Sequence, residues 1–236
     1  VNDLLEYSSL ESGRTPLVEK LFDLRAELEP VLRNFKTQSQ WKALEFTYRI
    51  DDAAPLRLIG DVDHTRQILV NLLNNAFAYT KKGFVSVTVA PWRGQSDGRG
   101  LSPITPRPGR CILHFTVKDS GIGIPSHRHD SLFEPFGSGS GTLDKQYSGG
   151  AGLGLAVCKR LAGMMRGDIW FESREGQGST FHFTVDFGLE ERSLQPERPV
   201  KAVPSPAIPA NLRILLAEDE PVNRIFTVRA LQKCGF

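Results

Sequence analysis

The sequence predicts an α/β protein, a two-layer α/β sandwich in which helices cover one face of a mixed sheet. Two observations lead to this fold class. Short runs such as residues 111–117 and 179–187 alternate apolar and polar side chains, which is the period of a half-buried strand. Between such runs lie segments whose apolar residues recur at helical spacing. With 236 residues and a hydrophobic fraction of 40%, the chain is long enough for one sizeable core.

The N-terminal part is expected to contain helices and short strands. Residues 1–14 carry apolar residues at helical spacing and stop at Ser12-Gly13, so we interpret them as the end of a helix from a preceding helical domain. Because the sequence starts without Met, within this pattern, we expect it to be part of a longer protein. The expected elements that follow are a strand over 17–24, a helix over 25–37, and strands over 44–50 and 56–60.

Residues 61–80 make the most informative predicted helix. Its expected core stripe is Ile68, Leu69, Leu72, Leu73, Ala76 and Phe77. Asn71 and Asn75 are four residues apart and so lie one above the other on the adjacent face, where two amide oxygens can hold one Mg²⁺. The alternative is a solvated polar face. Asparagine is a poor helix former, however, and three of them in five positions, with Asn74, favour a functional role.

We interpret residues 117–125, VKDSGIGIP, as a strand that ends in an acid and runs into a glycine turn. Asp119 lies at the strand end, where its carboxylate could accept a hydrogen bond from an exocyclic amine. Gly121 and Gly123 lack Cβ atoms, so a flat or charged ligand can approach the backbone closely. Taken alone, an Asp before such a turn is also an ordinary turn former. A strand over 84–92 and a Gly- and Pro-rich hairpin loop over 93–110 are expected before it.

A hinged lid followed by a glycine-rich helix start is predicted after this turn. The lid covers residues 130–149, whose Gly/Ser-rich tract has nothing to bury. Its apolar anchor is Leu132, Phe133, Pro135 and Phe136. The next helix is expected to run to Met165, and glycines at its start would expose backbone N–H groups to an anion. These glycines are Gly150, Gly152 and Gly154.

Strands over 169–173 and 179–187 are expected to close the domain as a hairpin. The alternation places His182 and His114 on outward faces, so we expect both to be exposed strand residues rather than ligands or bases. Residues 189–210 are rich in proline and predict an extended linker. Residues 211–236, an apolar strand followed by acids and a helix, begin a new unit.

The composition narrows the class of protein. A formal charge of +2 gives no case for nucleic acid or an anionic membrane as a partner. Three widely spaced cysteines suggest neither a disulfide framework nor a metal knuckle. There is no signal peptide, and no apolar run approaches the ~20 residues of a membrane span. We therefore expect a cytoplasmic location, with anchorage of the parent protein in the inner membrane left open.

Four motifs agree in order and spacing with one protein family. The Asn helix, DSGIG, LFEPF and GGAGLGL resemble the N, G1, F and G2 boxes of the catalytic ATP-binding domain of two-component sensor histidine kinases. The resemblance covers residues 15–188 and implies the histidine kinase-like ATPase fold. Residues 1–14 are similar to the end of the second dimerisation helix. Residues 211–236 resemble the start of a receiver domain, which implies a hybrid kinase.

The resemblance implies a site for ATP and Mg²⁺. In it Asn75 would coordinate Mg²⁺, Asn71 would support the phosphates and Asp119 would read the adenine amine. The purine pocket would be lined by Gly121 and Gly123, the lid anchored by Phe133 and Phe136, and the phosphates bound by Gly150, Gly152, Gly154 and Lys145. The implied reaction is transfer of the ATP γ-phosphoryl group to a histidine of the dimerisation domain. Further implied partners are a receiver domain or response regulator, and a second copy in the full-length homodimer.

Three features depart from the family pattern. Ala78 stands where the family usually has Lys or Arg, so a phosphate-directed cation is missing unless Lys81 or Lys82 substitutes. No histidine lies in a phosphoacceptor context, so the chain by itself is not expected to autophosphorylate. The receiver start, with Glu218 and Asp219 as its acidic pair, ends before a phosphoacceptor Asp.

Two other functions stay open. A degenerate, non-catalytic module that binds nucleotide and signals through its lid is favoured by Ala78. Another ATPase of the same fold, of chaperone or gyrase type, would need a catalytic Glu in the Asn helix. Residues 68–80 contain none, and LFEPF and the receiver start also argue against it.

Overall fold

A computed structural model describes residues 16–92, 107–135 and 153–190. The chain divides into two units, Val1–Glu191 and Arg192–Phe236, and all described residues belong to the first. The predicted dimerisation-helix end, the predicted receiver start and nearly all of the predicted linker therefore lie outside the described residues. The described helices are α2 Leu24–Trp41, α3 Val62–Tyr79 and α4 Gly154–Met164, with a short 3₁₀ helix, η1, at Ser126–Arg128.

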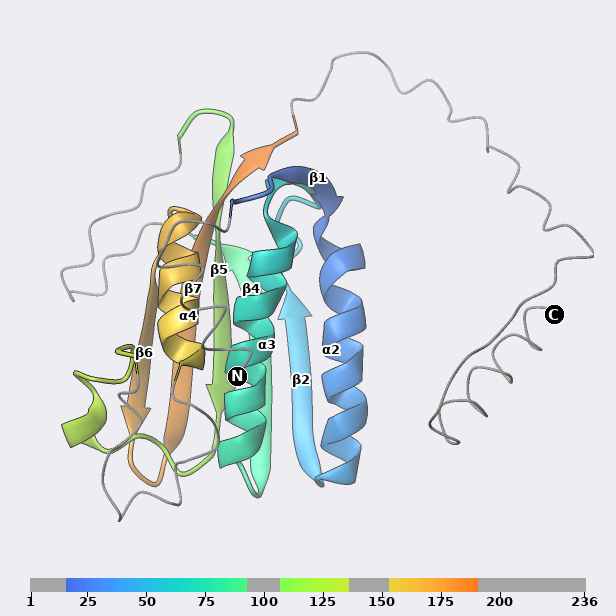
Figure 1. The fold of residues 1–236 in the computed structure, drawn as a ribbon. Coiled ribbons are helices and arrows are strands. Elements are labelled where there is room, and N and C mark those ends of the chain that lie inside the picture. The colour runs from blue at the N-terminus through green and yellow to red at the C-terminus, as the bar shows by residue number, and fades with distance from the viewer. Residues whose placement is uncertain (1–15, 93–106, 136–152, 191–236) are drawn as a thin grey trace, which may run out of the picture. The chain divides into compact units, whose positions relative to one another are not determined.

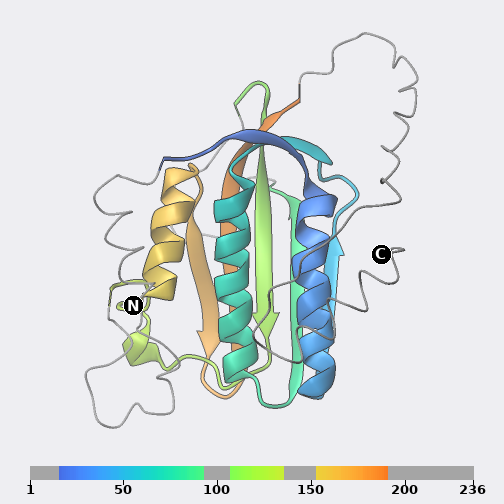
Figure 2. The same ribbon diagram turned by 45° about the vertical axis from the view of Figure 1, so that its right-hand side comes forward.

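The predicted mixed sheet with helices on one face is confirmed (Figures 1 and 2). Its strands are β1 Lys20–Asp23, β2 Leu44–Ile50, β3 Arg57–Gly60, β4 Gly83–Pro91, β5 Arg110–Asp119, β6 Ile169–Arg174 and β7 Gly178–Leu189. The strand order is β1-β3-β7-β5-β4-β2, and β6 also pairs with β7. Only the β2–β4 pairing of the described strands is parallel. The long β7 pairs with β6 near its start and with β3 at its end.

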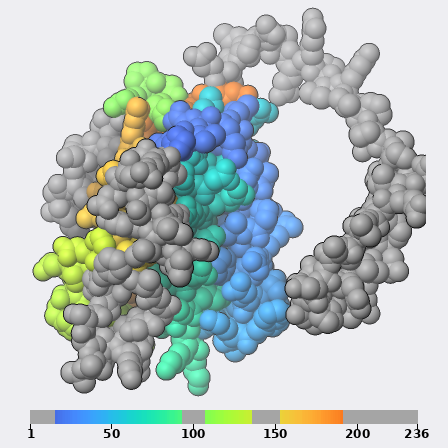
Figure 3. All heavy atoms as spheres, viewed as in Figure 1, coloured from blue at the N-terminus to red at the C-terminus, as the bar shows by residue number. Residues whose placement is uncertain are grey.

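The central helix α3 matches its prediction closely. Asp61 is its N-cap, and the Asp61 side chain accepts a hydrogen bond from the backbone N–H of His64 at 3.0 Å. All six residues of the predicted core stripe are buried, none with more than 5% of its surface exposed. The helix packs against α2 and α4. In the space-filling view, atoms of α2 and α3 lie side by side on the surface of the helix layer (Figure 3).

The first predicted strand and helix had the wrong boundary. The strand expected over 17–24 is shorter, because β1 ends at Asp23 and Leu24 already belongs to α2. The carboxylate of Asp23 accepts a hydrogen bond from the backbone N–H of Ala26 at 2.8 Å and so caps α2. Leu24 is 1% exposed, on the buried face of the helix. The helix also continues past residue 37 to Trp41.

Stacked aromatic rings hold the two central strands together. Phe115 of β5 and Phe183 of β7 are fully buried, with ring centroids 4.4 Å apart and planes 8° from parallel. Burying a side chain of this size stabilises the fold by roughly 1.5–3 kcal/mol. Because β5 and β7 are antiparallel, the end of β5 lies beside the start of β7. The core therefore fixes Asp119 and Ser179 at the same edge of the sheet.

The expectation that His114 and His182 are exposed was wrong, because both are half-buried. His114 Nε2 lies 3.0 Å from His182 Nδ1. The indole of Trp170 is within 11° of parallel to both imidazole rings, and Trp92 meets His114 edge-on. Histidine counts as polar in an alternating pattern. The pattern therefore could not reveal that two tryptophans cover this face of the sheet.

Candidate nucleotide site

Asp119 is held in one orientation by the backbone around it. It ends β5 and is only 6% exposed. Its Oδ1 accepts hydrogen bonds from the backbone N–H groups of Gly121 at 2.8 Å and Ser179 at 3.3 Å, while Oδ2 takes part in neither bond. Burial is the largest influence on the pKa of Asp119 and raises it. The two hydrogen bonds and the nearby Thr80 hydroxyl oppose this, but the pKa stays above its ordinary value of 3.8.

Two side-chain oxygens converge beside Gly121. A Cβ atom added at Gly121 would lie 2.9 Å from both Asp119 Oδ1 and Thr80 Oγ1, and 2.5 Å from the carbonyl oxygen of Tyr79. Thr80 Oγ1 is buried and forms no hydrogen bond of normal geometry with any described residue. A buried hydroxyl without a partner is unfavourable. This corner therefore offers a ligand an acceptor and a donor, and it is too tightly packed to admit a side chain at Gly121.

The structure shows that Gly123 serves a contact within the fold, whereas the prediction gave it a role in the purine pocket. Its φ is +68°, and an added Cβ would lie 2.0 Å from the carbonyl oxygen of Arg174 at the end of β6. Only glycine allows the turn after Asp119 to approach the β6–β7 turn this closely. That contact holds the turn in place, and a role in lining a purine pocket stays a prediction.

The two asparagines lie on α3 at increasing distance from the Asp119 corner. Asn71 and Asn75 are half-buried, whereas Asn74 is exposed. Asn75 precedes Thr80 by five residues and Asn71 by nine, which places them about 7.5 and 13.5 Å back along the helix axis. Thr80 thus lies at the C-terminal end of the helix that carries both asparagines.

Two contacts fix the direction of α4 along α3. Thr65 Oγ1 lies 3.6 Å from the sulfur of Met165, and Asn71 Nδ2 lies 3.7 Å from Sγ of Cys158. As the chain advances along α3 from 65 to 71, the contact on α4 moves back from 165 to 158. The two helices are therefore antiparallel.

This antiparallel packing brings the start of α4 to Asn75. Gly154 precedes Cys158 by one turn and Asn75 follows Asn71 by one turn, so Gly154 and Asn75 are about level. The N-cap residue Leu153 makes no side-chain hydrogen bond to the first N–H groups of α4. The positive end of this helix dipole is therefore not neutralised by its own cap.

Phe133 joins the segment after η1 to the rest of the domain. Its ring packs edge-on against Phe171 of β6, with centroids 5.8 Å apart, and the ammonium of Lys159 lies 5.8 Å from its ring centroid. These contacts fit the anchoring role, which stays a prediction. The other predicted lid and phosphate residues, Phe136, Lys145, Gly150 and Gly152, lie outside the described residues.

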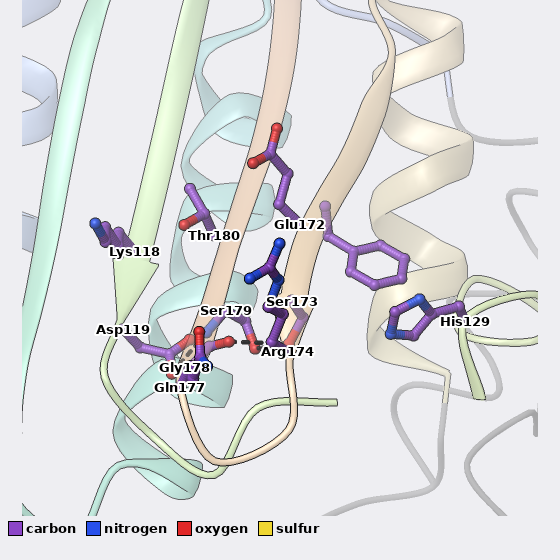
Figure 4. A pocket seen from close by; sticks show the side chains of 11 residues that line it. Lys118, Asp119, His129, Glu172, Ser173, Arg174, Gln177, Gly178, Ser179 and Thr180 are labelled. Carbon is purple, nitrogen blue, oxygen red and sulfur yellow. Dashed lines mark hydrogen bonds between the residues drawn. The ribbon is translucent and has the colours of Figure 1, made fainter. Parts of the chain in front are cut away.

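A pocket of about 490 Å³ lies where β5, β6 and β7 end or begin (Figure 4). Of the described residues that line it, Asp119 alone is a predicted site residue. Its charged lining residues include Lys118, Glu172 and Arg174. The Thr80 hydroxyl and Oδ1 of Asp119 instead meet beside Gly121, and Thr80 does not line this pocket.

Residues 60–189 match the model of the family described as histidine kinase-, DNA gyrase B-, and HSP90-like ATPase. The match covers more than half of the chain and includes Asn71, Asn75, Asp119 and Gly154. The chain belongs to this ATPase family. Its membership agrees with the fold and with the order of the motifs along the sequence.

The relatives of this ATPase domain are signalling proteins. Hybrid signal transduction protein dokA of Dictyostelium discoideum is 34% identical over 201 residues, covering 83% of this chain and 11% of that protein. Two-component system protein A of Emericella nidulans is 31% identical over 248 residues, covering 100% of this chain and 34% of that protein. The chain thus spans about a tenth to a third of the length of these relatives.

A solved structure is similar to this chain in both fold and sequence. Full-length ShkA, crystallised in complex with AMPPNP, matches with a TM-score of 0.63 and 28% identity over 80% of this chain and 35% of that chain. Signal transduction histidine-protein kinase BarA of Escherichia coli is 33% identical over 189 residues, covering 80% of this chain and 19% of that protein. Together these matches identify the described ATPase domain as a sensor histidine kinase catalytic domain. The predicted family is confirmed.

The ATPase domain lacks the basic residue expected on α3. Ala78 is exposed, and Lys81 and Lys82 are exposed beyond the end of the helix. Lys42 does reach this turn, but its Nζ donates a hydrogen bond to the carbonyl oxygen of Phe77 at 3.1 Å. There it complements the negative end of the α3 dipole rather than a phosphate.

Sequence reasoning missed Thr80 and Ser179 as parts of the site. Ser179 reaches Asp119 only because β7 pairs with β5, and that register cannot be read from either strand alone. For Thr80 a weak signal existed. It is the C-cap of α3 and so directly follows the Asn-bearing helix.

None of the described helices is both long and apolar enough to span a membrane. Within the same residues, no group of three or more His, Cys, Asp or Glu side chains could hold a metal ion. A Mg²⁺ ion does not need such a group, because it accepts one or two protein oxygens and completes its shell with phosphate oxygens and water. The amide oxygens of Asn71 and Asn75 fit that requirement.

Proposed function

We propose that this catalytic domain binds Mg²⁺-ATP and transfers the γ-phosphoryl group to a histidine of the dimerisation domain of its parent protein. The observation that supports this most is the convergence of Asp119 and Thr80 beside Gly121. It lies at the end of the helix that carries the two asparagines. The family membership and the relatives, one of which is named a histidine-protein kinase, support the same function.

Asp119 and Thr80 would recognise the adenine. The exocyclic amine of adenine would donate to the Asp119 carboxylate, which two backbone donors already hold in place. The Thr80 hydroxyl would bond to the neighbouring ring edge, directly or through water. Gly121 would line the purine pocket with its backbone, and Gly123 would keep the turn in position against β6.

The phosphates would extend back along α3 from the adenine. They would then reach Asn75 and the start of α4 at Gly154, where the helix dipole favours an anion. Mg²⁺ would be held by the amide oxygen of Asn75 and would neutralise the charge on the phosphates. The roles of Lys145, Gly150 and Gly152 in phosphate binding, and of Phe133 and Phe136 in the lid, are proposed from the resemblance.

Phosphoryl transfer requires positioning and charge neutralisation more than covalent chemistry by the protein. The acceptor histidine must therefore come from a domain that docks against the ATP site. We propose the dimerisation domain of a homodimeric parent protein, with a receiver domain or response regulator as the next acceptor. Because ATP is supplied inside the cell, this function also places the domain in the cytoplasm.

Transfer in trans tests this function. The chain is mixed with the isolated dimerisation domain of the parent protein and with ATP labelled on its γ-phosphoryl group. Label on the dimerisation domain, lost when its acceptor histidine is replaced by glutamine, is the expected result. Exposed Ala78 keeps one other function open, a module that binds nucleotide without transferring phosphate. ATP binding without any transfer would overturn the kinase function in favour of that module.

A further inference from the structure

Cys158 is a fully buried cysteine outside any disulfide of the described residues, and the proposed reaction does not use it. It lies on α4, one turn after Gly154, and its sulfur faces α3. The side-chain nitrogen of Asn71 approaches Sγ to 3.7 Å. An N–H group at this distance donates to sulfur, which is a weak acceptor. The contact joins a site asparagine to a residue that no motif includes.

This contact decides which way the Asn71 amide faces. An asparagine amide carries its NH₂ group and its carbonyl oxygen on opposite sides of Cγ. With Nδ2 toward Cys158, Oδ1 lies on the side of the amide away from that sulfur. A carbonyl oxygen repels phosphate oxygens, but it is a good ligand for Mg²⁺ or for a water bound to Mg²⁺.

We propose that Cys158 is a positioning residue of the nucleotide site: by accepting a hydrogen bond from Asn71, it presents the Asn71 amide oxygen to the cation rather than to the phosphates. The inference rests on the proposed function and refines it. Asn71 then acts one turn from Asn75 on the same ion. Its contribution to ATP affinity requires Mg²⁺ and disappears without it.

The same helix pair offers a matched control. Thr65 Oγ1 lies 3.6 Å from the sulfur of Met165, which is 4% exposed. The Thr65 hydroxyl also donates to the carbonyl oxygen of Asp61 at 2.7 Å, so it keeps a partner when the sulfur is removed. Met165→Leu therefore removes a buried sulfur contact from the α3–α4 interface without touching Asn71.

Calorimetric titration of the 236-residue chain with ATP, once with Mg²⁺ and once with EDTA, tests the inference. Cys158→Val is expected to weaken Mg²⁺-ATP binding about three- to tenfold, the worth of one hydrogen bond, and to change binding in EDTA less than about twofold. Cys158→Ser keeps an acceptor on a shorter bond and should fall between wild type and Cys158→Val. Met165→Leu should stay within about twofold of wild type in both titrations.

A second measurement needs no nucleotide. The side-chain NH₂ signals of Asn71 in the free protein, assigned by their loss in Asn71→Ala, are expected to shift in Cys158→Val and not in Met165→Leu. If Cys158→Val lost ATP affinity equally with and without Mg²⁺, Cys158 would matter only for packing, and the inference would be overturned. Wild-type Mg²⁺-ATP affinity in Cys158→Val would also overturn it. A wild-type chain that binds no ATP would overturn the proposed function instead.

Discussion

The backbone N–H of Val18 donates a hydrogen bond to Oδ2 of Asp61 at 2.8 Å, which ties the residues before β1 to the N-cap of α3. His64 adds two bonds to the same carboxylate, from its backbone N–H at 3.0 Å and its Nδ1 at 2.8 Å. Burial is the largest influence on the pKa of Asp61 and would raise it, but these hydrogen bonds outweigh it and the pKa is lowered. Because α3 carries both site asparagines, this carboxylate stabilises the helix on which the ATP site is built.

Asp61→Ala is expected to lower the free energy of unfolding by about 2–4 kcal/mol. The change removes an N-cap and leaves the backbone N–H of Val18 without its partner on this carboxylate. Asp63→Ala is the control in the same turn, since the Asp63 side chain is 55% exposed and its ion pairs with Lys20 and Arg66 are worth at most about 1 kcal/mol. Urea unfolding measures both, and equal effects would contradict this role of Asp61.

Asp119→Asn is expected to separate binding from folding. The folded state raises the pKa of Asp119, so stability falls as pH rises above 3.8 through the folded pKa, and the charged group is unfavourable at pH 7. The asparagine keeps an oxygen for the N–H groups of Gly121 and Ser179. Its thermal midpoint at pH 7 should therefore equal or exceed that of wild type, while ATP affinity falls about 10- to 100-fold.

A control for that change is Asp130→Asn, which replaces an exposed carboxylate near η1. It should alter neither the midpoint nor the ATP affinity. A clearly lower midpoint for Asp119→Asn would show that the Asp119 charge stabilises the fold, contrary to the burial argument.

Two glycine substitutions should differ in what they damage. Gly121→Ala places a Cβ 2.5 Å from the carbonyl oxygen of Tyr79 and should lower both stability and ATP affinity. At Gly154 no heavy atom of the described residues lies within 4 Å of an added Cβ, and alanine is the better helix former by about 1 kcal/mol. Gly154→Ala should therefore keep or raise the unfolding midpoint, so that any loss of ATP affinity reports on the phosphate site. Thermal unfolding and calorimetry on both variants test this, and a destabilised Gly154→Ala would contradict the open start of α4.

The folding stability of the domain should depend on the protonation of His114 at acid pH. Burial, and next the charge of His182, lower the pKa of His114 from 6.5 to about 4. A lowered histidine pKa means that the unfolded state binds the proton first. The contribution of His114 is therefore complete above pH 6.5 and is lost as pH falls from 6.5 to about 4.

Urea unfolding at pH 7 and pH 5 measures this dependence. The groups around His114 are the His182 ring, the Thr116 hydroxyl and the indoles of Trp92 and Trp170, and none of them supplies a negative charge. His114→Gln should reduce the loss of unfolding free energy between pH 7 and pH 5, whereas replacing the exposed His127 by glutamine should leave that loss unchanged. An identical pH dependence for wild type and His114→Gln would contradict the effect.

Local signals predicted much of the fold. The strand over 44–50 is observed with the predicted ends, and α3 lies within its predicted span because an N-cap and a 3.6-residue pattern agree there. The predicted boundary between the first strand and the first helix was wrong, because Leu24 suits either element. Only the bond from Ala26 to the Asp23 side chain shows that the helix starts there.

The site was less predictable than the fold. Motif order located Asp119 and the asparagines, but the partners of Asp119 depend on strand register, and the partner of Asn71 depends on how α4 packs on α3. Such pairings join residues that are 60 and 87 positions apart in the sequence. The stacked His114–His182 pair was missed for the same reason. The rings of this cluster come from β5, β6 and β7 and from Trp92, which follows β4.

The central claim is that α3 and the end of β5 form one Mg²⁺-dependent ATP site. Calorimetric titration of the chain with ATP and Mg²⁺, with Asn75→Ala beside wild type, tests it most directly. We expect wild type to bind, and either Asn75→Ala or removal of Mg²⁺ to weaken binding at least about tenfold, the effect of about 1.4 kcal/mol. A wild-type chain that fails to bind at millimolar ATP, or an Asn75→Ala variant with unchanged Mg²⁺-ATP affinity, would contradict the claim.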